Sequence, residues 1–315
     1  MSERILSEEK NHKKPKKRRP RNLDKAAVIM LVVFYLPMAI LDFIGFTQAR
    51  LGSILQIFQV EIPGKEVVWG FGNITRLFTE GFADTGVLRE GLRNSLLFFS
   101  LNFIGLPLNF IFAYFMYKKL LGHKFFRIVY YLPNIIPGIV FAMLVKYMTA
   151  PDGSGVLASL VYKYGGMSFP NIFGDSRYAI WGLLAYTVWS SFCAGFLLPL
   201  SSMKRVPQEV IESAQLDGIT WIGEIKDIIL PLIFPVLMML IIQLLPMIFT
   251  SSGAVLFFTQ GEYGTQTISY WIFDRVRTRN DLNYSTTVSF FFSLLTLPIS
   301  LFAYWLMNKV PAVEY

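Results

Sequence analysis

The chain has few charged residues, one cysteine and two histidines among its 315 residues. Charged side chains make up 16% of the sequence, against about 25% in an ordinary soluble domain, whereas 54% of the residues are hydrophobic. This balance indicates a membrane protein. Because Cys193 is alone, no disulfide can form within the chain. His12 and His123 lie far apart, without cysteine or carboxylate ligands at a suitable spacing, so we expect no metal site.

The sequence also lacks the residues of a catalytic or energy-converting centre. It has no G-x4-G-K-[S/T] loop that would hold the phosphates of a nucleotide. Asp42 and Lys146 fall toward the ends of apolar runs, and no series of carboxylates or histidines crosses those runs, as a proton-driven carrier would need. We therefore expect a protein that is not an enzyme, that has no cofactor of its own, and whose energy comes from outside the chain.

Six long apolar runs dominate the sequence. Each has about 20 residues or more, the length at which a helix crosses about 30 Å of hydrocarbon. Because no water is available there, the backbone must satisfy its own hydrogen bonds as a helix. The prediction is an all-α integral membrane protein with six transmembrane helices, at residues 26–47, 94–117, 126–148, 178–201, 228–251 and 286–308.

The basic residues are placed unevenly along the chain. Ten of the 29 Lys and Arg residues precede Ala26, and the polar connection at 118–127 is basic as well. The positive-inside rule puts both segments in the cytoplasm, and an even number of spans returns the C-terminus there. We predict a disordered basic tail at 1–25 that directs topology and binds no nucleic acid, a six-helix domain at 26–309 in the lipid bilayer, and a short cytoplasmic C-terminus at 310–315.

The polar segment between the fourth and fifth predicted spans carries a spaced motif. Its members are Glu212, the small pair Ser213–Ala214, Gly218 after three more residues, and Ile228-x-Leu230-Pro231 after nine more. The pattern resembles the EAA loop of the membrane subunits of bacterial ABC importers, of the form EAA-x3-G-x9-I-x-LP. Ser213 stands where that family usually has alanine.

Local signals predict the shape of this loop. Pro207 suits the first turn of a helix over 208–215, because its missing N–H is not needed there. Gly218 is placed to end that helix in a left-handed cap. A second short helix is predicted from Thr220, with its isoleucines facing the membrane or the bundle, before Pro231 starts the fifth span. The isoleucines concerned are Ile222, Ile225 and Ile229.

Further resemblance extends over about 26–308 and points to the carbohydrate-type branch of these permeases. It is carried by the segments Arg93-Asn94-Ser95, Tyr131-Leu132-Pro133, Val206-Pro207-x2-Val210 and Leu216-Asp217-Gly218. The resemblance implies a permease subunit in a bacterial cell membrane that forms half of the path for a sugar or oligosaccharide. It also implies the residues that couple the chain to an ATPase: Glu212, Ser213, Ala214, Asp217, Gly218, Ile228, Leu230 and Pro231.

The same resemblance implies partners. A second homologous permease would complete the path, and ABC ATPase subunits would bind ATP and Mg²⁺ on the cytoplasmic side. An extracytoplasmic solute-binding protein would dock on the connections at 48–93, 149–177 and 252–285, which the topology places outside. Two alternatives stay open: the solute is not a sugar, or the protein is an ion-coupled carrier that works without nucleotide.

Polar residues inside the last three predicted spans are candidates for the solute path. Hydroxyls and amides suit an uncharged polyol, because they donate and accept hydrogen bonds without burying a charge. Serine and threonine in a membrane helix can instead bond back to their own helix. The candidates are Tyr186, Thr187, Ser190 and Ser191 in the fourth span, Gln243 and Met247 in the fifth, and Ser293 in the sixth.

Overall fold

A computed structural model describes residues 25–47, 51–61, 67–83, 86–151, 154–251 and 253–309. The predicted C-terminal segment at 310–315 and all but the last residue of the predicted tail at 1–25 lie outside the described residues. The chain divides into two units, Met1–Ser53 and Ile54–Tyr315, which are described separately.

In its described part, the first unit contains one long helical run, at the position of the first predicted span. It consists of α2 (Lys25–Met30), the wider turns of η2 (Leu31–Tyr35), and α3 (Leu36–Phe46). Pro37 lies in the first turn of α3, where a missing N–H is tolerated. Apolar side chains cover the whole circumference of Val28–Phe46, and none is buried within its unit. A helix that is apolar all round is typical of a membrane span.

The second unit is helical apart from one short antiparallel pair of strands in its described part. These strands pair Gln59 with Trp69 and Val60 with Val68. The elements are, in order: α4 (Gly52–Gln56), which begins at the boundary between the units, β1 (Gln59–Val60), β2 (Val68–Trp69), α5 (Gly72–Arg76), η4 (Leu77–Gly81), α6 (Val87–Tyr117), α7 (His123–Ile135), α8 (Gly138–Met148), α9 (Val156–Gly165), α10 (Ala179–Gly195), α11 (Leu197–Met203), α12 (Gln208–Leu216), α13 (Trp221–Gly223), η5 (Glu224–Ile229), α14 (Leu230–Leu244), α15 (Met247–Thr250), α16 (Gly253–Phe258), α17 (Ile268–Arg279) and α18 (Leu282–Met307).

Four helices in the described part are long and apolar enough to cross a membrane: Val28–Phe46, Val87–Tyr117, Trp221–Thr250 and Leu282–Met307. The predicted third span is broken into α7 and α8, because Pro137 lacks an N–H and the preceding Ile136 is extended. The predicted fourth span is divided between α10, of 17 residues, and α11. The all-α membrane fold is therefore confirmed, whereas the number of six spans stays a prediction.

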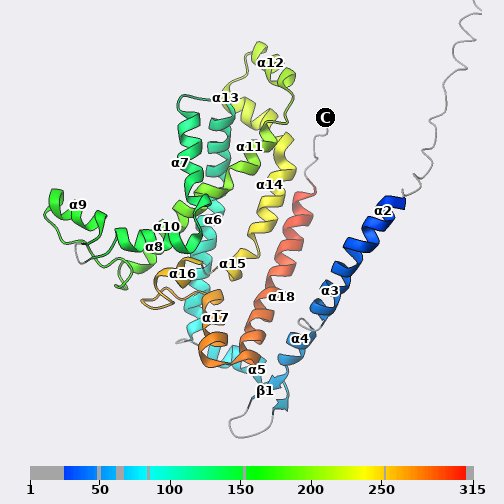
Figure 1. The fold of residues 1–315 in the computed structure, drawn as a ribbon, viewed down its shortest axis with the longest axis vertical. Helices are drawn as coiled ribbons and strands as arrows, with labels where there is room; N and C mark the ends of the chain where they lie inside the picture. Colours follow the sequence, from blue (N-terminus) through cyan, green and yellow to red (C-terminus); the bar gives the residue numbers. More distant parts are fainter. Residues whose placement is uncertain are drawn as a thin grey trace, which may run out of the picture. The chain divides into compact units, whose positions relative to one another are not determined.

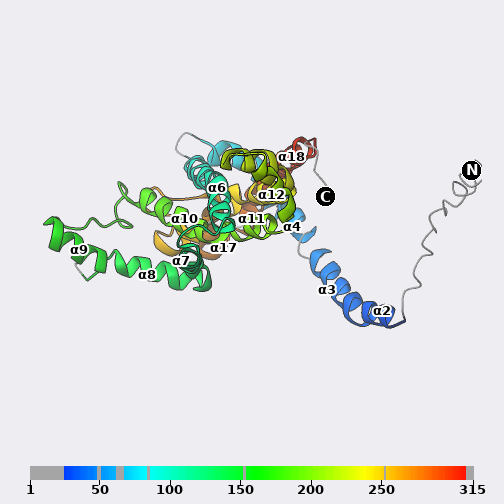
Figure 2. The same cartoon turned by 90° about the horizontal axis from the view of Figure 1, so that it is seen from above.

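Helix α6 organises the second unit. It packs against α10, α11, α15 and α17, and buries Leu88, Phe98 and Phe110 in three apolar clusters along its length. Figure 1 shows α12, α13 and the start of α7 at one end of this unit, with α5 and α17 at the other. Seen from above, α8 and α9 extend outward beyond α10 (Figure 2).

Ion pairs join the elements at the α5–α17 end. Arg76 pairs with Glu80 at 2.9 Å and with Asp281 at 3.4 Å, and Arg275 reaches the same Asp281 oxygen at 3.5 Å. Burial alone would lower the pKa of Arg76, but the hydrogen bond that Arg76 donates to Glu80 and the charge of Asp281 raise it above its ordinary value. Arg76 thus stays charged and holds η4 against the start of α18.

Candidate functional site

The first half of the motif segment is the short helix α12. Pro207 is its N-cap, one position before the predicted first turn, and Glu209 lies in the first turn near the positive end of the helix dipole. Glu212 and Ser213 are exposed, and Ala214 is half-buried. The Ser213 hydroxyl donates to the Val210 carbonyl at 3.1 Å, so its polar group is already satisfied within the helix. Ser213 and Ala214 therefore present a small, uncharged surface beside the exposed side chain of Glu212.

Gly218 ends α12 in the predicted left-handed conformation, with φ of 77°. The N–H of Ile219 donates to the Ala214 carbonyl and the N–H of Gly218 donates to the Gln215 carbonyl, both at 3.1 Å. This pair of bonds is the Schellman motif. A Cβ at position 218 would meet no atom within 4 Å, so backbone conformation rather than crowding favours glycine here. Asp217 precedes it as the exposed C-cap.

The second half of the segment differs from the prediction of a separate short helix. Thr220 caps α13 by accepting from the Gly223 N–H at 3.2 Å, and a helical run then continues through η5 and α14, with a turn at Leu245–Pro246 before α15, so that Trp221–Thr250 forms one membrane-long segment. Pro231 therefore lies inside this long helix instead of starting it. The wide turns of η5 directly precede Pro231 and accommodate its missing N–H.

The isoleucines of this segment are only partly buried in the bundle. Ile229 is fully buried, Ile225 and Ile228 are half-buried, and Ile222 is exposed, as is Leu230. The second half of the motif is thus the first two turns of a membrane-crossing helix. A displacement of the Gly218 turn would act directly on that helix.

A buried ion pair that the sequence analysis missed joins this helix to α6. Lys118, the C-cap of α6, donates to both carboxylate oxygens of Glu224, at 2.9 Å and 2.8 Å. The Glu224 side chain is only 4% exposed, and the Lys118 ammonium also lies 5.9 Å from the centre of the Tyr114 ring. A buried carboxylate needs such charge-assisted bonds, because leaving it unpaired is costly. The signal in the sequence that could have indicated this pair was the Glu224 carboxylate, which stands beside the isoleucines of the predicted second helix.

Five of the predicted solute-path residues line one cavity of about 270 Å³. They are Tyr186, Thr187, Ser190 and Ser191 from α10, and Met247 from α15. The opposite wall comes from α6, through Phe98 and Asn102. None of the described residues that line this cavity is charged.

The hydrogen bonds in this cavity separate two kinds of hydroxyl. Thr187 donates to the Leu183 carbonyl at 2.8 Å and Ser190 donates to the Thr187 carbonyl at 3.2 Å, so both bond back to their own helix. Ser191 instead donates to the Asn102 side chain at 2.8 Å and links α10 to α6. The sequence analysis missed Asn102, although an amide in the middle of a predicted span was a visible signal.

The other two predicted residues do not join this cavity. Ser293 lines a neighbouring cavity, also of about 270 Å³, together with Pro246 and Thr296, and its hydroxyl donates to the Ser289 carbonyl at 2.8 Å. Gln243 is exposed and lines neither cavity. The short helix α15 contributes Met247 to the first cavity and Phe249 to the second, so it separates the two.

Solved structures with this fold are membrane transporters. The chain superposes on a chain of a bacterial alginate ABC transporter in complex with an alginate pentasaccharide-bound periplasmic protein, with a TM-score of 0.77 and 21% identity, over 91% of this chain and 96% of the other. A second structure, of a bacterial ABC transporter involved in the import of the acidic polysaccharide alginate, gives a TM-score of 0.70 at 22% identity, over 90% and 93% of the two chains. Both likenesses establish the fold.

Sequence relatives are permease proteins. The probable ABC transporter permease protein MG188 homolog of Mycoplasma pneumoniae is 26% identical over 227 residues, 68% of this chain and 65% of the relative. The probable ABC transporter permease protein YesP of Bacillus subtilis is 26% identical over 194 residues, 59% and 62%. The trehalose/maltose transport system permease protein MalF of Thermococcus litoralis is 28% identical over 147 residues, 45% and 49%. The chain spans less than two-thirds of the length of each of these relatives.

A family model also matches a large part of the chain. Residues 95–311, more than half of the chain, match the family described as binding-protein-dependent transport system inner membrane component. The matched region includes α12, the Gly218 turn and both walls of the α6–α10 cavity. The chain therefore belongs to the family of binding-protein-dependent transport system inner membrane components.

Proposed function

We propose that this chain is a permease subunit of an ABC importer, which forms half of the path for a sugar or oligosaccharide and is coupled to a separate ATPase through Glu212–Pro231. The observation that carries the proposal is the geometry of that segment. A short exposed helix ends at a glycine turn and leads directly into a helix long enough to cross the membrane. Force applied to α12 would be transmitted to the solute path, because that same helix runs on to Met247.

The coupling residues have distinct roles in this proposal. Glu212 offers a charge to a basic residue of the ATPase, and the small Ser213 and Ala214 permit close approach of its surface. Asp217 and Gly218 hold the turn. Ile228, Leu230 and Pro231 carry the movement into the membrane-crossing helix. In this proposal ATP and Mg²⁺ would be bound by the ATPase, and this chain would need no cofactor of its own.

An uncharged saccharide is the solute class that the α6–α10 cavity favours. Asn102, Ser191, Thr187 and Tyr186 supply amide and hydroxyl groups, and Phe98 supplies an aromatic surface. One relative is the sn-glycerol-3-phosphate transport system permease protein UgpA of Yersinia pseudotuberculosis, 24% identical over 65% of this chain and 70% of the relative. A phosphorylated solute would call for a cation in the cavity, and its described lining has none.

The proposed assembly lies in a bacterial cell membrane with both termini in the cytoplasm. It contains a second homologous permease, two copies of the ATPase, and an extracytoplasmic solute-binding protein on the opposite face. The segments available for that protein include β1, β2 and α5 at one connection and α9 at another.

Purification from native membranes tests the proposal. The full chain is purified in mild detergent and its co-purifying proteins are identified by mass spectrometry, for the natural sequence and for Glu212→Lys, with Ser213→Ala as the control. We expect an ABC ATPase and a second permease with the natural sequence and with Ser213→Ala, and loss of the ATPase with Glu212→Lys. A chain that purifies alone and moves solute in vesicles without ATP would instead be an ion-coupled carrier.

A further inference from the structure

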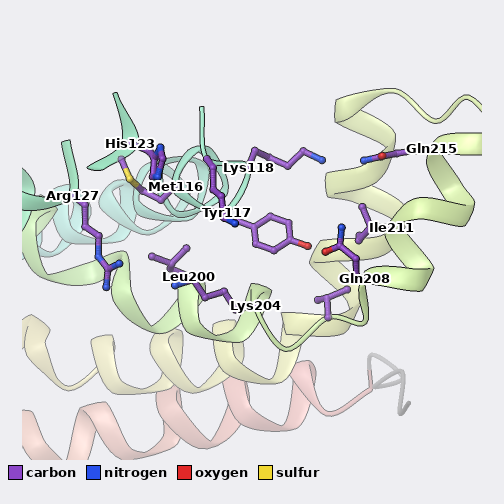
Figure 3. A pocket seen from close by; sticks show the side chains of 12 residues that line it. Met116, Tyr117, Lys118, His123, Arg127, Leu200, Lys204, Gln208, Ile211 and Gln215 are labelled. Carbon is purple, nitrogen blue, oxygen red and sulfur yellow. The ribbon is translucent and has the colours of Figure 1, made fainter. Parts of the chain in front are cut away.

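A cavity of about 610 Å³ lies beside α12, and it is separate from the proposed solute path. Four segments form it: the end of α6, the start of α7, the end of α11 and one face of α12. In Figure 3 its lining side chains reach in from the α6–α7 connection, from α11 and from α12. An occupant would therefore touch the proposed coupling helix and the bundle at once.

The lining of this cavity is strongly basic. Lys118, Lys119, Arg127 and Lys204 supply four cationic side chains, and His123 adds an imidazole. Lys118 is neutralised by Glu224. The other three cations form no ion pair in the part of the chain that the structure describes.

No carboxylate among the described residues lines the cavity to balance these charges. Helix α12 presents Gln208, Ile211 and Gln215, which lie on one face at spacings of three and four residues. Its acidic residues Glu209 and Glu212 are outside the lining. A concave site lined by charges of one sign concentrates the opposite ion.

We propose that this cavity binds a phosphate-bearing anion. Arginine offers a planar fork that matches phosphate oxygens, and lysine supplies a point charge. The amides of Gln208 and Gln215 add uncharged donors. The floor is apolar, from Met116, Leu200 and Val206, and suits the carbon part of the ligand.

Two sources can supply this chemistry. Basic pockets between membrane helices at the polar edge of a bilayer bind anionic lipid headgroups, and this cavity lies where α6 ends. A soluble phosphate compound would present the same group. Anion binding itself does not depend on the proposed transport function. The effect of binding on coupling does rest on that function: an anion held between Arg127, Lys204 and Gln215 would restrain α12 against the bundle.

The test compares two double variants of the full-length chain, purified in mild detergent. Arg127→Ser with Lys204→Ser removes two lining cations. Lys124→Ser with Arg205→Ser removes the same net charge from the same two segments, at exposed positions outside the lining. In one arm, each protein is titrated with phosphatidylglycerol in mixed micelles, with phosphatidylcholine as the comparison lipid. Native mass spectrometry measures the lipid that is bound. The other measures Tm in inorganic phosphate against chloride of equal ionic strength.

We expect the lining variant to bind the effective anion roughly thirtyfold more weakly at low ionic strength, since each membrane-surface cation contributes about 1 kcal/mol. The Lys124 and Arg205 variant should stay within about threefold of the natural chain. A response to phosphatidylglycerol alone supports a lipid headgroup, and a response to inorganic phosphate alone supports a soluble ligand.

Two results would overturn the proposal: no response of the natural chain to either anion, or equal losses in the two double variants. Arg127 and Lys204 are exposed, so both variants should fold. If the serine pair elutes as an aggregate, Arg127→Gln with Lys204→Gln carries the same comparison.

Discussion

At the scale of single residues, the shape of the coupling segment depends on Gly218. Its φ of 77° lies in the left-handed region, and the space around it is open. A larger side chain would therefore be excluded by backbone strain, of about 1–2 kcal/mol, and not by a clash. Asparagine tolerates this conformation better than other non-glycine residues.

Gly218→Leu should insert normally but lose most ATP-driven uptake, because the strained turn no longer holds α12 at its angle to the following helix. Gly218→Asn should keep most of the uptake. Uptake into vesicles, normalised to the amount of inserted protein, measures both. Normal uptake by a well-expressed Gly218→Leu protein would show that the turn is not needed for coupling.

A second residue-scale prediction concerns the hydrogen bond between Ser191 and Asn102, which joins α10 to α6 in the lining of the proposed solute cavity. Asn102→Leu removes an amide from the wall and leaves the Ser191 hydroxyl without this acceptor. We expect the KM for solute to rise about tenfold, the equivalent of one hydrogen bond of about 1.4 kcal/mol.

Ser293→Ala is the matched test for the neighbouring cavity, because it removes one hydroxyl on the other side of α15. The KM should change little in this variant. If Ser293→Ala raises the KM and Asn102→Leu does not, the path runs through the α18 side, and the proposed assignment of the cavity is wrong.

At the scale of elements, the Lys118–Glu224 pair fixes the end of α6 to the start of the membrane-crossing helix. Glu224→Ala leaves the partly buried Lys118 ammonium without its carboxylate, beside the other cations of the α12 cavity, and should reduce stability by about 3 kcal/mol. Lys118→Met with Glu224→Met removes both charges and should recover most of that loss. Denaturant unfolding in detergent measures the three proteins, with the exposed Glu212→Ala as control. A double variant no more stable than Glu224→Ala would disprove this coupling.

Helix α6 is also bound at its other end, where Asn94 is fully buried. Its amide donates to the carbonyls of Gly264 and Gln266, at 2.9 Å and 2.8 Å, and Ser95 accepts from the Ile268 N–H at 3.1 Å. Two neighbouring residues of α6 thus position the segment that leads into α17. These contacts give a physical role to the Arg93-Asn94-Ser95 pattern.

Asn94→Leu removes two hydrogen bonds from a fully buried amide and should destabilise the second unit by about 2 kcal/mol. Ser100→Ala is the control, since the Ser100 hydroxyl bonds only to its own helix, at the Leu96 carbonyl. Thermal unfolding in detergent compares the two variants. Equal Tm values would mean that the Asn94 bonds contribute nothing to the join between α6 and α17.

Local signals predicted the parts of this fold that a few neighbouring residues decide. Pro207 and Gly218 set the ends of α12 within one residue, and helical spacing brought the polar residues of α10 to one cavity.

The Lys118–Glu224 contact joins positions 106 residues apart, and no local pattern encodes such a distance. Similarly, the depth of Gln243 in its span did not reveal which face it occupies. Pro231 was expected to start a helix, yet the wide turns before it let the helix continue.

At the scale of the whole molecule, the apolar surface requires a covering. The side chains of Val28–Phe46 are all exposed within their own unit, and large apolar side chains are exposed along α6, α14 and α18. Lipid or a second permease would have to shield this surface. The direction of insertion then depends on charge, because the α6–α7 connection and the start of α7 carry Lys118, Lys119, Lys124 and Arg127.

This orientation is testable because Cys193 is the only cysteine in the sequence. In a Cys193→Ser background, Leu121→Cys places a thiol in the α6–α7 connection, where the natural side chain is 97% exposed, and Tyr164→Cys places one in α9, where it is 78% exposed. A membrane-impermeant maleimide added to spheroplasts should label Tyr164→Cys at once and Leu121→Cys only after permeabilisation. Cys193→Ser alone should stay unlabelled. The reverse pattern would put α12 outside the cell, beyond the reach of any cytoplasmic ATPase, and would defeat the proposed coupling whatever the geometry of the Gly218 turn.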